Sequence, residues 1–235
     1  MLPVLFLVLL YNADACCMPA TWSAEHSFNV FTATGLAGPE KALGWYAAGG
    51  IYADGVKHRL AVTDSGFAVS VQPKFNGNLA PYVGRVVFDL VAGEFALTSN
   101  LTGCYKGAIP PAFGKIVQMG NFNCFSPANK VKSIQLAGGA ADVYTQSFFQ
   151  AGHGGFNLTQ TVDPTSCRIY ANSGVVLNGN GIDSPVAFFQ QNLWNIASGV
   201  PSGVFDIPST NCTVLNTTAA LALTRHYSVL AHMLA

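Results

Sequence analysis

Charged residues are unusually scarce in this sequence. Lys and Arg together number 11, Asp and Glu together number 11, only 9% of the 235 residues are charged, and the formal net charge is zero. A typical soluble domain carries about 25% charged residues. Without a basic excess the chain cannot neutralise phosphates, which excludes a nucleic-acid-binding protein. Intrinsic disorder is excluded too, because disordered chains combine low hydrophobicity with high net charge, whereas 50% of this chain is hydrophobic.

Motifs for catalysis and metal binding are also missing. The chain contains no G-x-S-x-G, P-loop, H-E-x-x-H or EF-hand sequence, and no C-x-x-C pair. His153-Gly154-Gly155 has the form of an esterase oxyanion loop, but without a nucleophile motif it reads as a glycine-rich turn. We therefore expect a protein that is not an enzyme; a hydrolase would need a Ser–His–acid cluster assembled by the fold. The histidines, which share no metal-ligand spacing, are His26, His58, His153, His226 and His232.

No segment reaches the roughly 18 uninterrupted apolar residues of a transmembrane helix. Residues 1–10 are nevertheless apolar, and Ala13-Asp14-Ala15 follows shortly after them. This order is typical of a secretory signal peptide over residues 1–15, with an N-terminal core helix as the alternative. Residues 16–218 then form one domain, because no linker or repeat divides them, and residues 219–235 form a C-terminal amphipathic tail.

Six cysteines follow the expected cleavage site. Their even number fits a framework of three disulfides in a secreted protein, and the residues alone leave the pairing open. Six reduced, buried cysteines in a cytosolic protein are the alternative. The cysteines are Cys16, Cys17, Cys104, Cys124, Cys167 and Cys212.

Four N-x-[ST] sequons predict N-glycosylation, at Asn100, Asn157, Asn211 and Asn216. Glycans are bulky, hydrated and confined to the surface, so they would keep a charge-poor chain soluble. Four unmodified surface asparagines are the alternative. With the signal segment and the even cysteine count, the sequons predict a secreted, extracellular glycoprotein.

Short strand-like segments alternate with turn residues along most of the chain. Phe156, Leu158, Gln160 and Val162 recur at every second position, which predicts one face of a half-buried strand. Such segments, rich in β-branched and aromatic residues, predict a mainly β, antiparallel domain. A hairpin is expected from 85–91 and 94–98, turns at 47–50 and 64–66, and helices near 108–118 and in the C-terminal tail.

Several segments, in the same order, resemble those of ependymin-related proteins. Residues 17–22 match the family's Cys…Pro…Trp opening, and 52–59 resemble its Tyr-Asp…Arg hairpin. Residues 88–104 are similar to its next hairpin, which ends in a cysteine, and 161–167 match another cysteine-bearing segment. Most specific is 188–212, where two aromatics precede a Gly…Pro-Ser…Phe…Pro run that closes at a cysteine. The resemblance spans residues 16–212.

This resemblance implies a fold and a function. Members of the family are secreted or lysosomal glycoproteins with two stacked, curved antiparallel β-sheets and few short helices. The sheets form a half-barrel like that of lipoprotein carriers and enclose a hydrophobic pocket. Vertebrate members are dimeric and are associated with lipid binding, calcium and cell–matrix adhesion. Calcium is thus the one cofactor implied, and no motif here assigns its ligands.

The resemblance also implies a disulfide pairing. Carried over by position, the family's bonds would join Cys17 to Cys167 and Cys104 to Cys212. Cys16 and Cys124 would remain as an atypical third pair.

The pocket is expected to hold a hydrophobic small molecule or lipid. Apolar ligand surface removed from water contributes about 25 cal/mol per Å², and no charged anchor is needed. A homodimer and extracellular matrix contacts are the other partners that the resemblance implies. The alternative is a matrix or adhesive structural component whose interior is filled by its own side chains. The expected wall residues are Phe88, Leu90, Phe95, Phe156, Leu158, Phe188, Phe189 and Trp194.

Overall fold

The structure is a computed structural model that describes residues 16–32, 44–69, 79–100, 103–109, 124–150, 154–177, 185–207 and 212–216. The predicted signal segment, the C-terminal tail and nearly all of the predicted helix near 108–118 lie outside these residues. Those three features therefore stay predictions.

Almost all of the described chain is β-strand, and its one helical turn is the 3₁₀ turn Pro127–Asn129. This confirms the mainly β prediction. The strands are β1 (Cys16–Cys17), β2 (Thr21–Thr32), β3 (Gly44–Asp54), β4 (Arg59–Val69), β5 (Leu79–Asp89), β6 (Glu94–Ser99), β7 (Gly103–Ala108), β8 (Cys124–Phe125), β9 (Lys130–Leu136), β10 (Gly139–Gln150), β11 (Gly154–Val162), β12 (Ile169–Leu177), β13 (Pro185–Ser198) and β14 (Thr213–Leu215).

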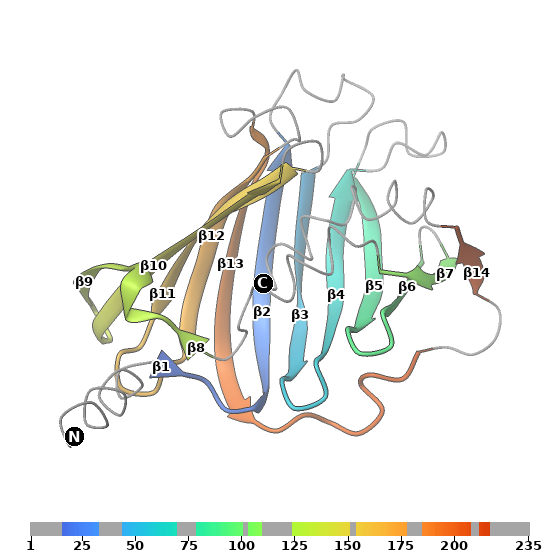
Figure 1. The fold of residues 1–235 in the computed structure, drawn as a ribbon. Helices are drawn as coiled ribbons and strands as arrows, with labels where there is room; N and C mark the ends of the chain where they lie inside the picture. The colour runs from blue at the N-terminus through green and yellow to red at the C-terminus, as the bar shows by residue number, and fades with distance from the viewer. Residues whose placement is uncertain are drawn as a thin grey trace.

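Twelve of these strands form one sheet in the order β14-β7-β6-β5-β4-β3-β2-β13-β12-β11-β10-β9 (Figure 1). Strands β2 to β7 form one antiparallel meander and β9 to β13 form another. The pairing of β2 with β13 joins the two meanders, while β14 adds to β7 in parallel. Strands β1 and β8 form a separate two-stranded sheet.

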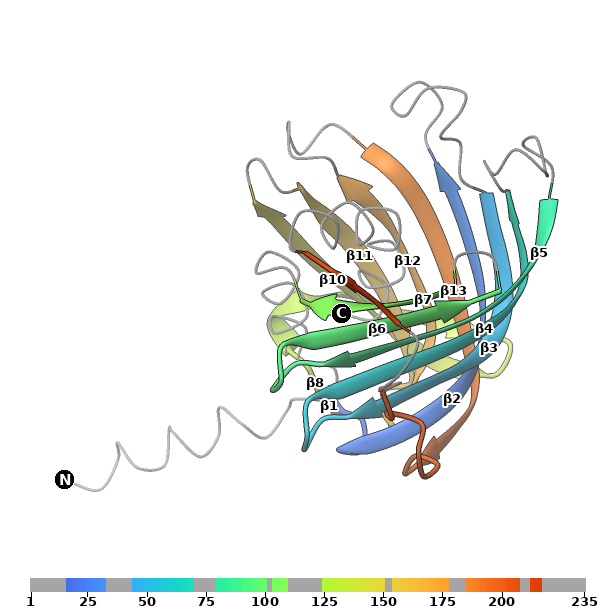
Figure 2. The ribbon, with the colours of Figure 1, turned by 90° about the vertical axis from the view of Figure 1, so that its right-hand side faces the viewer.

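The twelve-stranded sheet curls so that its two ends face each other. In Figure 2, β5, β6 and β7 cross in front of β10, β11 and β12. Phe95 of β6 and Phe156 of β11 accordingly belong to one buried apolar cluster, together with Phe28 near the middle of the sheet. The sheet does not close, because β9 and β14 each pair on one side only. The curved antiparallel half-barrel is thus confirmed, and its two walls are the ends of a single sheet.

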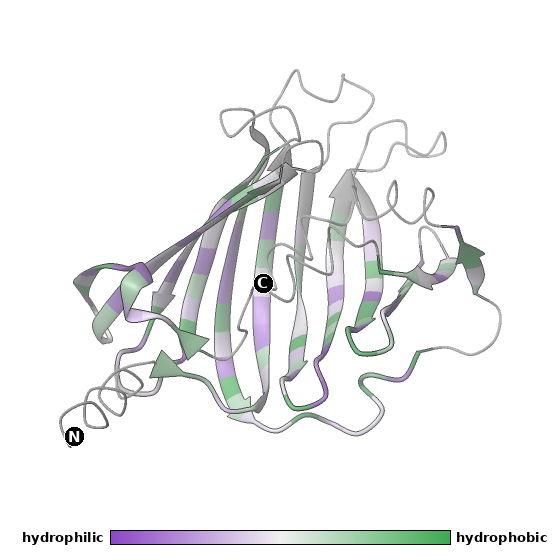
Figure 3. Cartoon of the chain, in the orientation of Figure 1, coloured by the Kyte–Doolittle hydropathy of each residue, from purple (hydrophilic) through white to green (hydrophobic). Residues whose placement is uncertain are grey.

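Alternation of side chains builds the concave face. In β2 the even positions, including Trp22, Phe28 and Val30, are buried, whereas Ser23 and Glu25 point to the other face. Successive side chains of a strand point to opposite faces, so this period puts the apolar set on one side. Figure 3 shows the resulting change of hydropathy along the strands. In β11 the predicted inward set, Phe156 to Val162 at every second position, is buried as expected.

Two predicted turns are wrong, while the predicted hairpin formed by β5 and β6 is confirmed. Residues 47–50 and 64–66 continue as ladder residues of β3 and β4, which pair without interruption from Trp45↔Ala68 to Asp54↔Arg59. Glycine and aspartate usually favour turns. Here Gly49 and Asp64 lie opposite each other in mid-sheet, where close packing against neighbouring strands overrides the local preference.

Three disulfides involve all six cysteines, and one predicted pairing is confirmed. Cys104 of β7 bonds to Cys212, just before β14. The other two pairings are wrong: Cys16 bonds to Cys167, and Cys17 bonds to Cys124. The physical reason is strand alternation. Cys16 and Cys17 point to opposite sides of β1, and the β1–β8 register places Cys17 directly opposite Cys124.

The pairing is testable with a single substitution. In Cys167→Ser, we expect the released thiol to be that of Cys16, because Cys17 stays bonded to Cys124. Alkylation of the folded protein, followed by digestion and fragment-ion mass spectrometry, distinguishes the two neighbouring cysteines. Label on Cys17 instead would contradict the pairing in the structure and support the Cys17–Cys167 bond that the resemblance implies.

Candidate functional site

The concave face is the first candidate site, and it brings together most of the predicted wall residues. Five of the eight are buried in the main apolar cluster, and Leu90 packs against that cluster from the β5–β6 turn. They come from β5, β6, β11 and β13, so both walls of the half-barrel contribute. The buried five are Phe88, Phe95, Phe156, Leu158 and Phe189. Whether these residues contact a ligand stays a prediction.

Phe188 and Trp194 do not belong to this face, so their assignment to the wall is wrong. They are 46% and 40% exposed, whereas their neighbours Phe189 and Leu193 are buried in the cluster. Because side chains alternate along a strand, the inward positions of β13 are already taken by Phe189 and Leu193.

A row of polar side chains crosses the otherwise apolar concave face. We call it the polar row. All members but Gln146 are at most 6% exposed. Its members are Gln146 (β10), Gln160 (β11), Asn172 (β12), Gln191 (β13), His26 (β2) and Asp64 (β4).

The members of the polar row bond to one another in sequence. Gln146 Nε2 donates to Gln160 Oε1 at 3.2 Å, and Gln160 Nε2 donates to Asn172 Oδ1 at 3.2 Å. Asn172 Nδ2 then donates to Gln191 Oε1 at 2.8 Å. Each amide thus donates to the next member of the row, which runs in one direction from β10 towards β13.

The row ends in an imidazole–carboxylate pair. Gln191 Nε2 lies 3.1 Å from His26 Nδ1, and His26 Nε2 lies 3.0 Å from Asp64 Oδ1. Since the amide nitrogen can only donate, Nδ1 accepts and the ring hydrogen lies on Nε2. The contact between Nε2 and Asp64 Oδ1 is short but does not have hydrogen-bond geometry. An unpartnered buried polar group costs about 1–3 kcal/mol, and the amides of the row avoid that cost by bonding to one another.

Strand β3 crosses the polar row without contributing a side chain. Its residue at this level is Gly49, which lies between His26 and Asp64 in the register. A Cβ at Gly49 would come within 1.7 Å of the Thr63 carbonyl oxygen, so the close approach of β4 requires glycine. The imidazole of His26 therefore reaches across β3 to Asp64.

Ion pairs lie beyond each end of this face. At β9–β10, Lys130 Nζ lies 2.7 Å from Asp142 Oδ2, and Ser133 Oγ donates to Asp142 Oδ1 at 2.7 Å. Hydrogen bonds from Lys130 and Ser133 hold the pKa of Asp142 below its usual value, and the bond to Asp142 raises the pKa of Lys130. At the β3–β4 turn, burial acts to raise the pKa of Asp54, but hydrogen bonds and charge from Arg59 and Lys57 outweigh it and leave that pKa lowered.

The outer face of β4 and β5 is partly covered by residues 199–207, which we call the strap. Arg85 of β5 donates to the carbonyl oxygens of Gly203, at 3.2 Å, and Asp206, at 3.0 Å. Phe205 packs on Ala61 and Val87, and the Arg59 guanidinium lies 4.5 Å from the centre of its ring. The strap falls within the segment that most resembles ependymin-related proteins.

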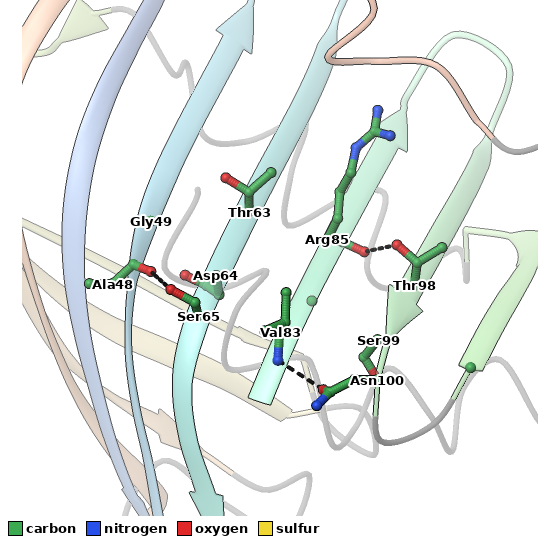
Figure 4. A pocket seen from close by; sticks show the side chains of 12 residues that line it. Ala48, Gly49, Thr63, Asp64, Ser65, Val83, Arg85, Thr98, Ser99 and Asn100 are labelled. Carbon is green, nitrogen blue, oxygen red and sulfur yellow. Dashed lines mark hydrogen bonds between the residues drawn. The ribbon is translucent and has the colours of Figure 1, made fainter. Parts of the chain in front are cut away.

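Two neighbouring pockets are lined mostly by outer-face side chains. The first has a volume of about 540 Å³ and extends across β3 to β6 (Figure 4). Ser65, Val83 and Asn100 line it on the far side from the polar row. The second, of about 530 Å³, extends over β13, β2 and β3 and shares Ala48 and Gly49 with the first.

The predicted glycosylation sites that the structure describes are all exposed. Asn157 lies on the outer face of β11, and Asn216 follows β14. Asn100 follows β6, where its side chain accepts from Val83 N at 2.8 Å and donates to the Pro81 carbonyl oxygen at 2.9 Å. Asn211 lies outside the described residues. Glycan attachment at each stays a prediction.

Within the described ranges no three His, Cys, Asp or Glu side chains are placed to hold a metal ion together. The calcium site implied by the resemblance stays a prediction. A search of the same residues for a helix long and apolar enough to cross a membrane finds none.

Comparisons with known proteins add little to this geometry. No protein-family model and no curated protein matches the chain. Among solved structures, a LolA superfamily protein from Nitrosomonas europaea overlaps with 79% of this chain and 90% of its own, at 7% identity and a TM-score of 0.32. A β-barrel-like protein of a domain of unknown function from Brucella abortus overlaps with 77% of this chain and 99% of its own, at 9% identity and a TM-score of 0.21. TM-scores this low define no shared fold. The resemblance to ependymin-related proteins stays a prediction.

Sequence reasoning missed the polar row. It noted Gln160 on an apolar face but treated His26 only as one histidine among five. The available signal was the position of His26 between Ala24 and Phe28, on the apolar side of an alternating strand. Its partners, Asp64 and Gln191, both lie more than 30 residues further along the chain, so only the fold reveals them.

Removal of His26 should strongly destabilise the fold. His26→Leu leaves Asp64 as a buried carboxylate without its partner, which costs about 3–5 kcal/mol of unfolding free energy. The double variant His26→Leu/Asp64→Leu should recover part of this loss, because it also removes the unpaired Asp64 carboxylate. Urea unfolding gives the free energy of unfolding of each variant.

The control His58→Asn, in an exposed turn at φ 50°, should stay within about 0.5 kcal/mol of the parent. Equal stability of His26→Leu and the parent would refute the role of the pair.

Acid should remove a stabilising contribution from Asp142. Its folded pKa is lowered, so this contribution is fully present above the unfolded value of about 3.9 and is lost as pH falls through the folded value. Asp142→Asn should therefore be less stable than the parent at pH 7, with the difference shrinking towards pH 2. Thermal unfolding across this range tests the expectation. Glu94→Gln, at an exposed position of β6, serves as the control. A stability difference between Asp142→Asn and the parent that stays constant with pH would contradict the expectation.

Proposed function

We propose that this chain is a secreted, disulfide-bonded, ependymin-like glycoprotein that binds a hydrophobic or lipid-like ligand along its concave face. One observation carries the proposal: both ends of an unclosed sheet contribute to a single apolar cluster. A flat sheet would offer no such shared apolar surface between two walls.

Ligand binding in this fold depends on the two walls moving apart. The cluster residues are buried, so an entering ligand replaces wall-to-wall contacts with contacts to itself. Among the described strands, β9 and β14 are not paired to each other, so no ladder of hydrogen bonds between these two strands opposes that movement. Each methylene group of the ligand that leaves water contributes about 0.8 kcal/mol.

Three disulfides support an oxidising compartment such as the extracellular space. Structural disulfides are rare in the cytosol, where thiols are kept reduced. Cys16–Cys167 and Cys17–Cys124 tie β1 to both the β11–β12 turn and β8, and neither bond links the two edge strands, β9 and β14, to each other.

The test compares matched phenylalanines on the two faces. Phe156→Ala should weaken the binding of a fluorescent acyl-chain probe by about tenfold, since loss of roughly 1.4 kcal/mol of apolar contact corresponds to that factor. Phe188→Ala, at an exposed position on the outer face, should leave the affinity within about twofold. Probe titration by fluorescence gives both values, and urea unfolding checks that each variant is folded.

Extraction and mass spectrometry of the parent protein complete the experiment. Co-purifying lipid would support the proposal. A folded parent that carries no lipid and binds no acyl probe would overturn it and favour the adhesive structural alternative.

A further inference from the structure

The second outer-face pocket is built around Glu25 of β2. Its volume is about 530 Å³, and it lies on the opposite side of the sheet from the apolar cluster. Nine residues line it, among them Glu25, Gly50, Tyr52, Trp194 and Asn195.

Aromatic side chains line this pocket on both sides of Glu25. On the β13 side Trp194 is its register partner, and the indole Nε1 donates to Glu25 Oε2. On the β3 side its register partner is Gly50. A Cβ at Gly50 would lie 2.2 Å from the Tyr52 hydroxyl, so the Tyr52 ring extends over this glycine. The absence of a side chain at Gly50 thus leaves room for the Tyr52 ring beside the register partner of Glu25.

A backbone irregularity sets this arrangement. The β13–β2 register shifts between Trp194 and Ala197, and Asn195 adopts a φ of 51°. Left-handed conformations cost free energy in residues other than glycine and tend to persist where the surroundings hold them. Here Asn195 Nδ2 donates to Glu25 Oε2 at 3.0 Å, so two neutral donors from one bulge hold the same carboxylate oxygen.

The charge of Glu25 is not neutralised by these contacts. No lysine or arginine is among the nine lining residues, and within the described ranges Glu25 takes part in no ion pair. The arginines nearest in the sheet are engaged elsewhere, Arg59 with Asp54 and Arg85 with the strap carbonyls. The pocket therefore presents one negative charge between a tryptophan and a tyrosine.

We propose that this pocket binds an organic monocation of the trimethylammonium type. Quaternary ammonium groups are attracted to the faces of Trp and Tyr rings, and a carboxylate adds to this attraction. A hard metal ion fits less well, because Ca²⁺ needs six to eight oxygen ligands and the pocket offers one carboxylate. The group would belong either to a free choline-like solute or to a lipid headgroup. This site is independent of the concave face, so either proposal can fail without the other.

The test compares choline with its uncharged isostere 3,3-dimethylbutan-1-ol, by saturation-transfer NMR on the methyl protons. We expect choline to bind at least about tenfold more tightly than the alcohol, because only choline carries the charge. Glu25→Gln keeps the acceptor for Trp194 and Asn195 but removes the charge, and should weaken choline binding by about tenfold. Glu94→Gln, an exposed acid on β6, is the matched control and should leave binding unchanged. Trp194→Leu, which removes the indole, should also weaken it.

Vesicle flotation separates the two sources of the cation. Retention on phosphatidylcholine but not on phosphatidylglycerol vesicles, lost in Glu25→Gln, supports the site and assigns it to a lipid headgroup. Choline binding without vesicle retention supports it as a solute site. Equal affinity for choline and the alcohol, or undiminished choline binding by folded Glu25→Gln, would overturn the proposal.

Discussion

The contact between Gln191 and His26 lies at the seam on which the whole sheet depends. Strand β2 begins the first meander and β13 ends the second, so their pairing turns two separate sheets into one curved wall. A slip of one residue at this seam would send every inward side chain to the outer face. In β2 such a slip would expose Phe28 and bury Glu25. The polar row opposes that slip, because His26 must meet Gln191 on one side and Asp64 on the other.

The two faces of the sheet follow different physical rules. On the concave face, apolar side chains from both walls pack together, and most of the buried polar side chains of the described strands bond to one another along the row. The amides of Gln160, Asn172 and Gln191 are buried there, so each needs a hydrogen-bond partner within the protein. The outer face is covered only in part by the strap, and it leaves Trp194 and Glu25 accessible. A hydrophobic ligand thus suits the first face, whereas the second offers a charge and aromatic rings to a cation.

Particular residues show how far local pattern predicts this fold. Alternation predicted the inward face of β11 correctly, because a half-buried strand must separate apolar from polar residues at every second position. The same reasoning failed at Gly49 and Asp64, whose usual preference for turns is overridden by the β3–β4 ladder and by His26. It also put Phe188 and Trp194 on the wrong face. A run of apolar residues in β13 carries no clear alternation, so the choice of face depends on which neighbours β2 and β12 supply.

The sequence by itself determined that this chain is a mainly β domain with few charges, even-numbered cysteines and a strand period that separates two faces. These properties are local, since they depend on composition and on spacing of two residues. Only the tertiary structure decided that β2 pairs with β13, that Cys16 rather than Cys17 bonds to Cys167, and that six polar residues form one row across the concave face. Each of these features depends on contacts between segments far apart in the chain. The curvature of the sheet and the register of its strands bring these partners together, and no local pattern specifies either.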